Sequence, residues 1–470
     1  MNPWDLSVNL KSVILDLMYL SSFILIGTWL RRYVKFFQKF LIPNNLIGGF
    51  IALLVSTQGF GWIDLPSERL GLYVYHFLAL TFIALGLRQQ KSGWGKGPLS
   101  KALGTLSTYL LQALIGLGVA FTLFYTIMPD LFIGMGLLLP LGFGMGPGLA
   151  FAMGNSWEQW GFVGGGQVGL TFAAIGYLYA FFVGMAIIQW GIRNGKAALI
   201  KSTDHITNDM RIGVNKSGEY PIAGHLTLST EAIEPMAFQL GLMGFCYLIT
   251  YWVVDLLAGA LASAGLNDFV ATLWSFHFVV ALLVALSVRK IMDMTGRSYV
   301  IDAGLMTRAM GVFLDYLVVG AVAAISFVIV GKYWLPILIM SLLAGPATYA
   351  LLKWISWRAF DNFHFERFVE IFGEMTGTIN SALVLLRVTD PEFKTPVAED
   401  AVYGSGIALF IGLPLLVALN IPFAFYKGAL MGYWVTAGVL VGYWILLTIV
   451  WRAIGYIHFR RQATDLTRGN

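Results

Sequence analysis

Eleven long apolar stretches, separated by short polar loops, run through this 470-residue chain. A helix needs about 20 apolar residues to cross the hydrocarbon core of a bilayer, because each residue adds about 1.5 Å. Only 12% of the residues are charged, whereas a soluble domain has roughly 25%. We therefore predict an all-α polytopic membrane protein. The expected spans are Ser12–Leu30, Leu41–Ser56, Gly71–Leu87, Leu103–Met128, Val163–Trp190, Met236–Leu257, Phe269–Val288, Val312–Val330, Trp334–Trp354, Ala401–Ala418 and Ala429–Trp451.

Basic residues lie in alternate loops, and this sets the expected orientation of the spans. Cations, Lys101 and Arg367 among them, follow the first, third, seventh and ninth spans and occupy the insert 191–235. Loops 58–69, 262–268 and 420–428 are almost free of them. Cytoplasmic loops carry such an excess of Lys and Arg. The pattern predicts an external N-terminus and a cytoplasmic C-terminus, and it explains the net charge of +5 without a nucleic-acid partner.

Two glycine-rich segments interrupt the apolar pattern at equivalent places. Residues 131–158 follow the fourth span of the first half, and residues 368–390 follow the fourth span of the second half. Dense glycine weakens a helix, and lipid cannot satisfy the freed backbone groups, so such segments lie within protein or line a wet cavity. We predict an inverted repeat of five transmembrane helices plus one re-entrant segment per half. The halves are 1–190 and 236–420, joined by a cytoplasmic linker at 191–235 and followed by an extra C-terminal helix at 429–451.

Three motifs lie in or near these segments. They are Ile42-Pro43-Asn44-Asn45-Leu46-Ile47-Gly48-Gly49, Gly144-Met145-Gly146-Pro147-Gly148 and Gly373-Glu374-Met375-Thr376-Gly377-Thr378-Ile379-Asn380-Ser381-Ala382. With them the chain resembles the bacterial glutamate:sodium symporter family over residues 12–420. The resemblance implies two inverted five-span halves, sodium-coupled uptake of glutamate and a place in the bacterial inner membrane. The family usually has His and Thr where Met145 and Pro147 stand, so other small carboxylate anions stay open as substrates.

The two glycine turns form the expected binding site. A helix that begins after each turn would present unpaired N–H groups and a partial positive charge to a carboxylate at the membrane midplane. Pro147 suits the first position of such a helix, and Thr378, Asn380 and Ser381 can cap the second one. The expected substrate-binding residues are Gly146, Gly148, Thr378, Asn380, Ser381 and, as a weaker candidate, Arg387. Sodium prefers oxygen ligands and would take the carbonyls of Gly144, Gly146 and Thr376 and the Thr378 hydroxyl.

The expected function is a sodium-coupled symporter that works by alternating access, with Na⁺ as coupling ion and no organic cofactor. The alternatives are a proton-coupled or exchange-type organic-anion carrier, a channel, or a membrane enzyme. An enzyme is disfavoured because the six histidines show no metal-binding spacing and the single cysteine, Cys246, lies in an apolar stretch. The expected partners are the substrate, membrane lipid and, as an option, a second copy of the chain in a homodimer.

Ionisable side chains within spans are costly and are therefore candidates for function. Asp16 and Asp315 lie within a turn or two of a span start, where we expect their carboxylates to reach toward the membrane interface. His76 and His277 lie nearer mid-span, and we expect hydrogen-bonded interior imidazoles rather than a proton relay. The glycines in Gly404-Ser405-Gly406 are expected to serve helix packing.

Single-cysteine labelling tests the orientation. In a Cys246→Ala background, His205→Cys and Asp465→Cys should be protected from a membrane-impermeant maleimide added to intact cells, because both positions lie in cytoplasmic segments by the cation rule. Asp5→Cys should be labelled under the same conditions. Labelling of position 205 from outside would contradict the whole orientation.

Overall fold

The computed structural model describes residues 9–88, 95–200, 211–214, 222–266, 270, 273–391 and 393–458, which are mostly helical. Within this part of the chain, eight helical stretches are long and apolar enough to cross a membrane. They are α1 (Leu10–Tyr33), α4 (Ser67–Leu87), α5 (Lys96–Thr126), Gly165–Arg193, α11 (Pro235–Ser263), α14 (Ala303–Ala323), α15 (Phe327–Ala359) and α21 (Leu430–Ala453). The chain is therefore a multi-pass membrane protein. Positions 5, 205 and 465, used in the labelling test, lie outside the described residues.

Three of the eleven expected spans do not meet this standard. α3 (Asn44–Val55) is an apolar helix of only 12 residues, shorter than the about 20 of a full span. α13 (His277–Met294) has 18 residues and carries charged side chains in its last turns. α18 (Val397–Ile411) and α19 (Leu413–Leu419) form a span only across a 49° bend. By length and composition, eight helices, or nine with the bent pair, qualify as full spans among the described residues, fewer than the eleven expected. The expected span Phe269–Val288 begins in residues outside the described part.

Several helix starts follow local side-chain chemistry. The Asp302 carboxylate accepts a hydrogen bond from the Leu305 N–H at 2.7 Å and caps α14. Ser326 lies at the same position before α15. α5 begins at Lys96, earlier than the expected start at Leu103, so Lys101 lies inside the helix rather than in a loop.

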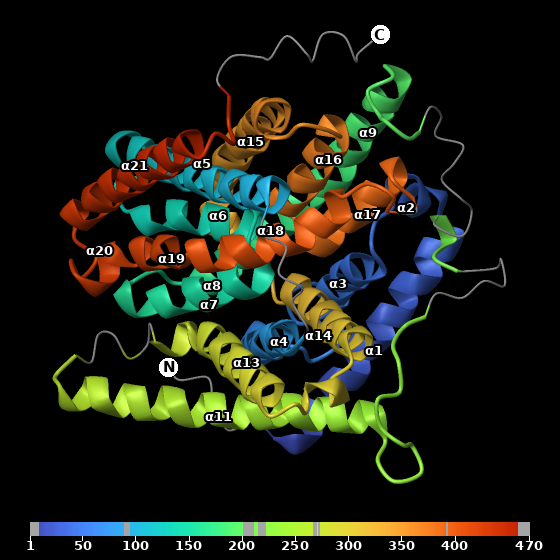
Figure 1. The fold of residues 1–470 in the computed structure, drawn as a ribbon. Helices are drawn as coiled ribbons and strands as arrows, with labels where there is room; N and C mark the ends of the chain where they lie inside the picture. Colours follow the sequence, from blue (N-terminus) through green and yellow to red (C-terminus); the bar gives the residue numbers. More distant parts are fainter. Residues whose placement is uncertain are drawn as a thin grey trace.

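The helices form two groups (Figure 1). α1, α3, α4, α11, α13 and α14 pack on one another in the lower part of the view, and the helices from α5 to α9 and from α15 to α21 form the upper part. α7 touches both groups, because it packs against α4 and α14 as well as α8. The shorter elements are α2 (Lys35–Phe40), η1 (Ile133–Leu137), α6 (Leu138–Phe143), α7 (Pro147–Ser156), η2 (Trp157–Trp160), α8 (Gly165–Leu178), η3 (Tyr179–Val183), α9 (Gly184–Arg193), η5 (Ser298–Val300), α16 (His364–Met375), α17 (Ile379–Thr389) and α20 (Ile421–Ala424).

Asp16 lies in a buried ion pair and does not extend its carboxylate to the surface as expected. Its two carboxylate oxygens accept hydrogen bonds from Arg69 at 2.7 and 2.8 Å, and Oδ2 also accepts one from the Tyr73 hydroxyl at 3.1 Å. The Asp16 side chain is 1% exposed and that of Arg69 is 18% exposed. Arg69 compensates the charge of the Asp16 carboxylate inside the protein, so this carboxylate does not require solvation by water.

The two mid-span histidines have interior partners, as expected. The ring nitrogens of His277 lie 3.1 Å from the carbonyl oxygens of Trp274 and Tyr75. Nδ1 of His76 lies 2.6 Å from the Tyr247 hydroxyl. Both imidazoles therefore join helices of the lower group to one another.

The Asp16–Arg69 pair gives a stability prediction. Asp16→Asn should lower the free energy of unfolding by about 2–3 kcal/mol, because removing one partner of a buried pair strands the other. Asp64→Asn is the matched control, since Asp64 also contacts Arg69, at 3.2 Å, but is 79% exposed; it should cost less than about 1 kcal/mol. Thermal unfolding of the purified protein in detergent measures both. Equal losses would show that burial of the pair does not matter.

Candidate functional site

The first interrupted segment consists of α6 and α7, separated by Gly144–Gly146. Gly146 is the N-cap residue of α7, with φ +91° and ψ 168°, a backbone conformation that is essentially restricted to glycine. Pro147 is the first residue of the helix, as expected. No side chain caps this start, so the first N–H groups of α7 remain available to another acceptor.

The second interrupted segment consists of α16 and α17, separated by Thr376–Thr378. Thr378 is the N-cap residue of α17, but its hydroxyl makes no capping hydrogen bond. Asn380 and Ser381 lie within the first turn of the helix, so the expectation that they cap it is wrong. Like α7, α17 begins with unpaired backbone N–H groups.

The tips of the two segments meet beside α5. A Cβ atom placed on Gly146 would lie 3.4 Å from Cγ2 of Thr378, and one on Gly144 would lie 3.4 Å from the Met375 carbonyl oxygen. Two side chains of α5 satisfy the carbonyls freed at the breaks. The Tyr109 hydroxyl donates to the Gly144 carbonyl at 3.2 Å. Nε2 of Gln112 donates to the Met375 carbonyl at 3.0 Å.

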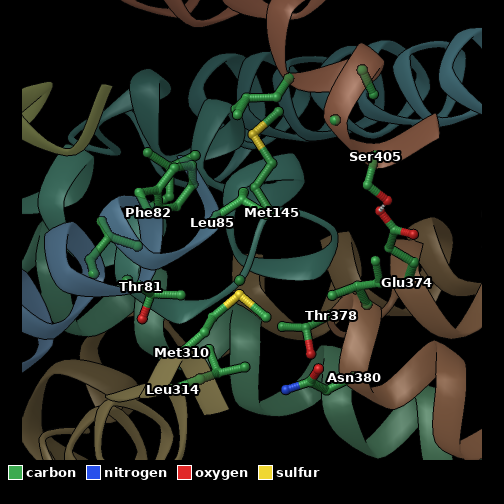
Figure 2. A pocket seen from close by; sticks show the side chains of 18 of the residues that line it. Thr81, Phe82, Leu85, Met145, Met310, Leu314, Glu374, Thr378, Asn380 and Ser405 are labelled. Carbon is green, nitrogen blue, oxygen red and sulfur yellow. Dashed lines mark hydrogen bonds between the residues drawn. The ribbon is translucent and has the colours of Figure 1, made fainter. Parts of the chain in front are cut away.

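A cavity of about 310 Å³ opens at this meeting point, between the two groups of helices. Figure 2 shows that its walls differ. The lower helix group and the first tip contribute mainly apolar side chains, namely Phe82, Leu85, Met145, Met310 and Leu314. Glu374, Thr378, Asn380 and Ser405, from α16, α17 and α18, form a polar wall. A pocket of this kind can hold a small molecule with an apolar body and polar ends.

The structure places five of the eight expected site residues on the cavity wall. These are Gly144, Gly146, Gly148, Thr378 and Asn380. Ser381 and Thr376 are buried behind the wall, and the Thr376 hydroxyl donates to the Phe372 carbonyl at 2.7 Å. Arg387 is exposed, and its guanidinium lies 5.1 Å from the centre of the Phe393 ring. It faces away from the cavity.

The charged groups of this site, Lys101, Glu374 and Arg88, are not among the site residues expected from the sequence. Nζ of Lys101 lies 2.5 Å from Oε2 of Glu374, and the pair is almost fully buried. Ser405 donates to Oε1 of Glu374 at 2.8 Å. Arg88, at the end of α4, also lines the cavity. Glu374 and Ser405 lie inside sequence motifs named above, whereas the sequence predicts a cytoplasmic loop position for Lys101 and, as a cation that follows the third span, for Arg88.

Gly404 allows close packing of α18 against α5, as expected, but the side chain that packs against it is that of a charged residue, Lys101. A Cβ atom on Gly404 would lie 2.6 Å from Cδ of Lys101, so the glycine makes room for the lysine stem. Gly406 has open space beside it and lines the cavity.

Comparison with known proteins gives one match. The family model described as sodium/glutamate symporter matches residues 10–360. This range includes α6 and α7 and ends before α16. No curated protein and no solved structure matches the chain.

The hydrogen bonds from α5 to the second tip give a further prediction. Gln112→Leu should lower the free energy of unfolding by about 1–3 kcal/mol, because it leaves the buried Met375 carbonyl without its donor. Gln112 also donates to the Thr348 hydroxyl at 3.0 Å. Thr348→Val removes that acceptor and leaves the bond to the tip, so it should cost about 1 kcal/mol. Thermal unfolding in detergent compares the two. A larger loss in Thr348→Val would contradict a special role for the tip carbonyl.

Proposed function

Because the chain belongs to the sodium/glutamate symporter family, we propose that it moves glutamate or a similar small carboxylate across the membrane with Na⁺ by alternating access. That family consists of transporters, not enzymes. The observation that carries the proposal is the cavity of about 310 Å³ at the meeting point of two uncapped helix starts. Such a volume lies within the usual range for small-molecule sites.

The proposed architecture is an inverted repeat with halves 1–190 and 236–420. Its support is a pattern of helix contacts that recurs when the halves are exchanged. α4 packs on α13 as α14 packs on α3, and α5 packs on α18 as α15 packs on α8. α6/α7 and α16/α17 then occupy equivalent places as re-entrant segments that enter from opposite sides. Transporters with this design bind substrate where the two repeats meet.

The proposed orientation places the N-terminus outside and the C-terminus in the cytoplasm of the bacterial inner membrane. Arg88 at the end of α4 and Thr307 near the start of α14 both line the cavity. In this orientation both helix ends lie on the cytoplasmic side. The cavity then belongs to a state that is open toward the cytoplasm, as expected for the release step of uptake.

The substrate carboxylate would bind at the two helix starts. The first turns of α7 and α17 contribute unpaired N–H groups and the positive ends of two helix dipoles. Gly148 and Asn380, in those turns, line the cavity. Arg88 supplies a full positive charge for a second carboxylate, which a dicarboxylate such as glutamate has. Met145, Phe82 and Met310 would contact the aliphatic part.

Sodium would bind to oxygens at the same tips, as part of the cargo. Gly144, Gly146 and Thr378 line the cavity, and the Thr378 hydroxyl makes no capping bond. The Thr376 carbonyl fits less well, because a Cβ atom on Gly176 of α8 would lie 2.6 Å from it. It faces α8 rather than the cavity. We therefore propose the carbonyls of Gly144 and Gly146 and the hydroxyl of Thr378 as sodium ligands.

Two threonines at the second tip test this assignment. Thr378→Val keeps the shape and removes the hydroxyl, so it should raise the Na⁺ concentration for half-maximal uptake about tenfold, as expected for one lost contact of roughly 1–2 kcal/mol. Thr376→Val is the matched control, because that hydroxyl bonds its own helix and lies outside the cavity. Uptake of labelled glutamate into proteoliposomes across a range of Na⁺ concentrations measures both variants.

The same assay decides the broader proposal. Wild-type uptake that is saturable and driven by a Na⁺ gradient supports the symporter. Uptake that ignores Na⁺ at clamped pH and membrane potential contradicts sodium coupling. Unchanged Na⁺ dependence in Thr378→Val would remove that hydroxyl from the ion site.

A further inference from the structure

Behind the polar wall of the cavity lies a buried cluster of charges. α16 contributes Glu370 and Glu374, which are four residues apart and so share one face of the helix. Lys101 of α5 contacts Glu374 at 2.5 Å and the Ser405 hydroxyl of α18 at 2.5 Å. Lys101 and Glu370 are each 1% exposed. Only Glu374 and Ser405 reach the cavity.

The charges in this cluster do not balance. Lys101 of α5 neutralises Glu374. Arg367 of α16, the other cation near Glu370, pairs with Asp400 of α18 at 2.8 Å. Glu370 has no cation of its own among the described residues. Its Oε1 atom is buried and makes no hydrogen bond to any of them. An ionised carboxylate in this position would be an uncompensated buried charge, which is costly.

The helices that pack against α16 offer no further cation to Glu370. Their other cations have partners or surroundings elsewhere. Lys96 pairs with Asp361, Lys353 lies over the Tyr349 and Trp190 rings, and Lys332, Arg358 and Arg387 lie over the Tyr333, Trp354 and Phe393 rings. Arg193 is exposed. Glu366, one turn earlier on α16, accepts from the Ala198 N–H. The electrostatic neighbours of Glu370 are thus Lys101, Glu374 and Arg367.

A proton balances this charge better than a metal ion does. No group of three or more His, Cys, Asp or Glu side chains in the described residues could hold a metal ion. A proton needs only one carboxylate oxygen, and Glu370 has an unpartnered one.

We propose that Glu370 carries a proton that leaves when Na⁺ binds in the cavity, so that the carrier exchanges a proton as well as moving Na⁺. The O–H bond of the Glu370 carboxylic acid breaks, and the proton passes by way of the neighbouring Glu374 carboxylate, which lines the cavity, to water there. The cluster then has two carboxylates and one ammonium, and a cation beside the polar wall compensates the extra negative charge. This inference rests on the proposed sodium-coupled function. By linkage, protons and Na⁺ weaken each other's binding to the same extent.

Proton release can be measured without transport. Purified wild-type protein in weakly buffered detergent with a pH indicator should release up to about one proton per chain when NaCl is added, and none with choline chloride. Glu370→Gln cannot lose that proton and should release none. Glu399→Gln, the same change at an exposed position on α18, should behave like wild type. Absence of release from the wild type, or equal release from Glu370→Gln, overturns the proposal.

Transport gives the second measurement and separates the two proposals. In wild-type proteoliposomes the Na⁺ concentration for half-maximal uptake should rise with acidity, by up to about tenfold per pH unit, as expected when one proton opposes one ion. In Glu370→Gln it should not change with pH. Sodium-driven uptake with a pH-independent Na⁺ requirement in the wild type overturns the proton exchange and leaves the symporter intact. Sodium-induced proton release without Na⁺-driven glutamate uptake overturns the symporter and leaves the proton site.

Discussion

The segments α6/α7 and α16/α17 each break at a glycine turn inside the fold, and the backbone groups freed at each break must find partners without help from lipid. α5 supplies the partners for the carbonyl side of both breaks, through Tyr109 to Gly144 and Gln112 to Met375. These two side chains lie three residues apart, so they share one face of one helix. The relative position of the two tips, and with it the cavity, depends on that face of α5.

At each break a freed backbone carbonyl has a hydrogen-bond partner on α5, whereas the freed backbone N–H groups have no capping side chain. This difference gives the site its chemistry. The carbonyl ends are bonded to α5, while the amide ends, at the starts of α7 and α17, have no capping side chain. The tips therefore present N–H groups and positive helix ends to the cavity. Glu374, the acidic residue on the cavity wall, is held by Lys101 and Ser405, so it does not cancel that positive potential. An anion beside the tips meets donors rather than a free carboxylate.

The parts that could be predicted from the sequence are the ones that local chemistry decides. Apolar length located the helices, dense glycine located both breaks, and Pro147 marked the start of α7, because each signal depends on neighbouring residues. Partners far apart in the chain were not predictable. Lys101 lies 273 residues from Glu374, and as a cation near a span end it has the sequence signature of a loop residue. Asp16 was misjudged for the same reason, since Arg69 becomes its neighbour only when α1 and α4 meet.

These buried pairs also strengthen the charge argument for orientation. Arg69 is the one cation of segment 58–69, which the cation rule places outside, and Asp16 neutralises it within the protein. Lys101 and Arg367, counted on the cytoplasmic side, are likewise paired with Glu374 and Asp400. A cation that is neutralised inside the fold carries no net charge across the membrane, so the excess of Lys and Arg in cytoplasmic loops does not apply to it. When these three are set aside, Lys427 is the one cation left in segments 58–69, 262–268 and 420–428, and the remaining loop cations keep their asymmetry. The charges in this sequence thus fall into two kinds, those that orient the chain in the membrane and those that the fold buries in pairs, and the cavity wall has one of each in Arg88 and in the pair of Lys101 with Glu374.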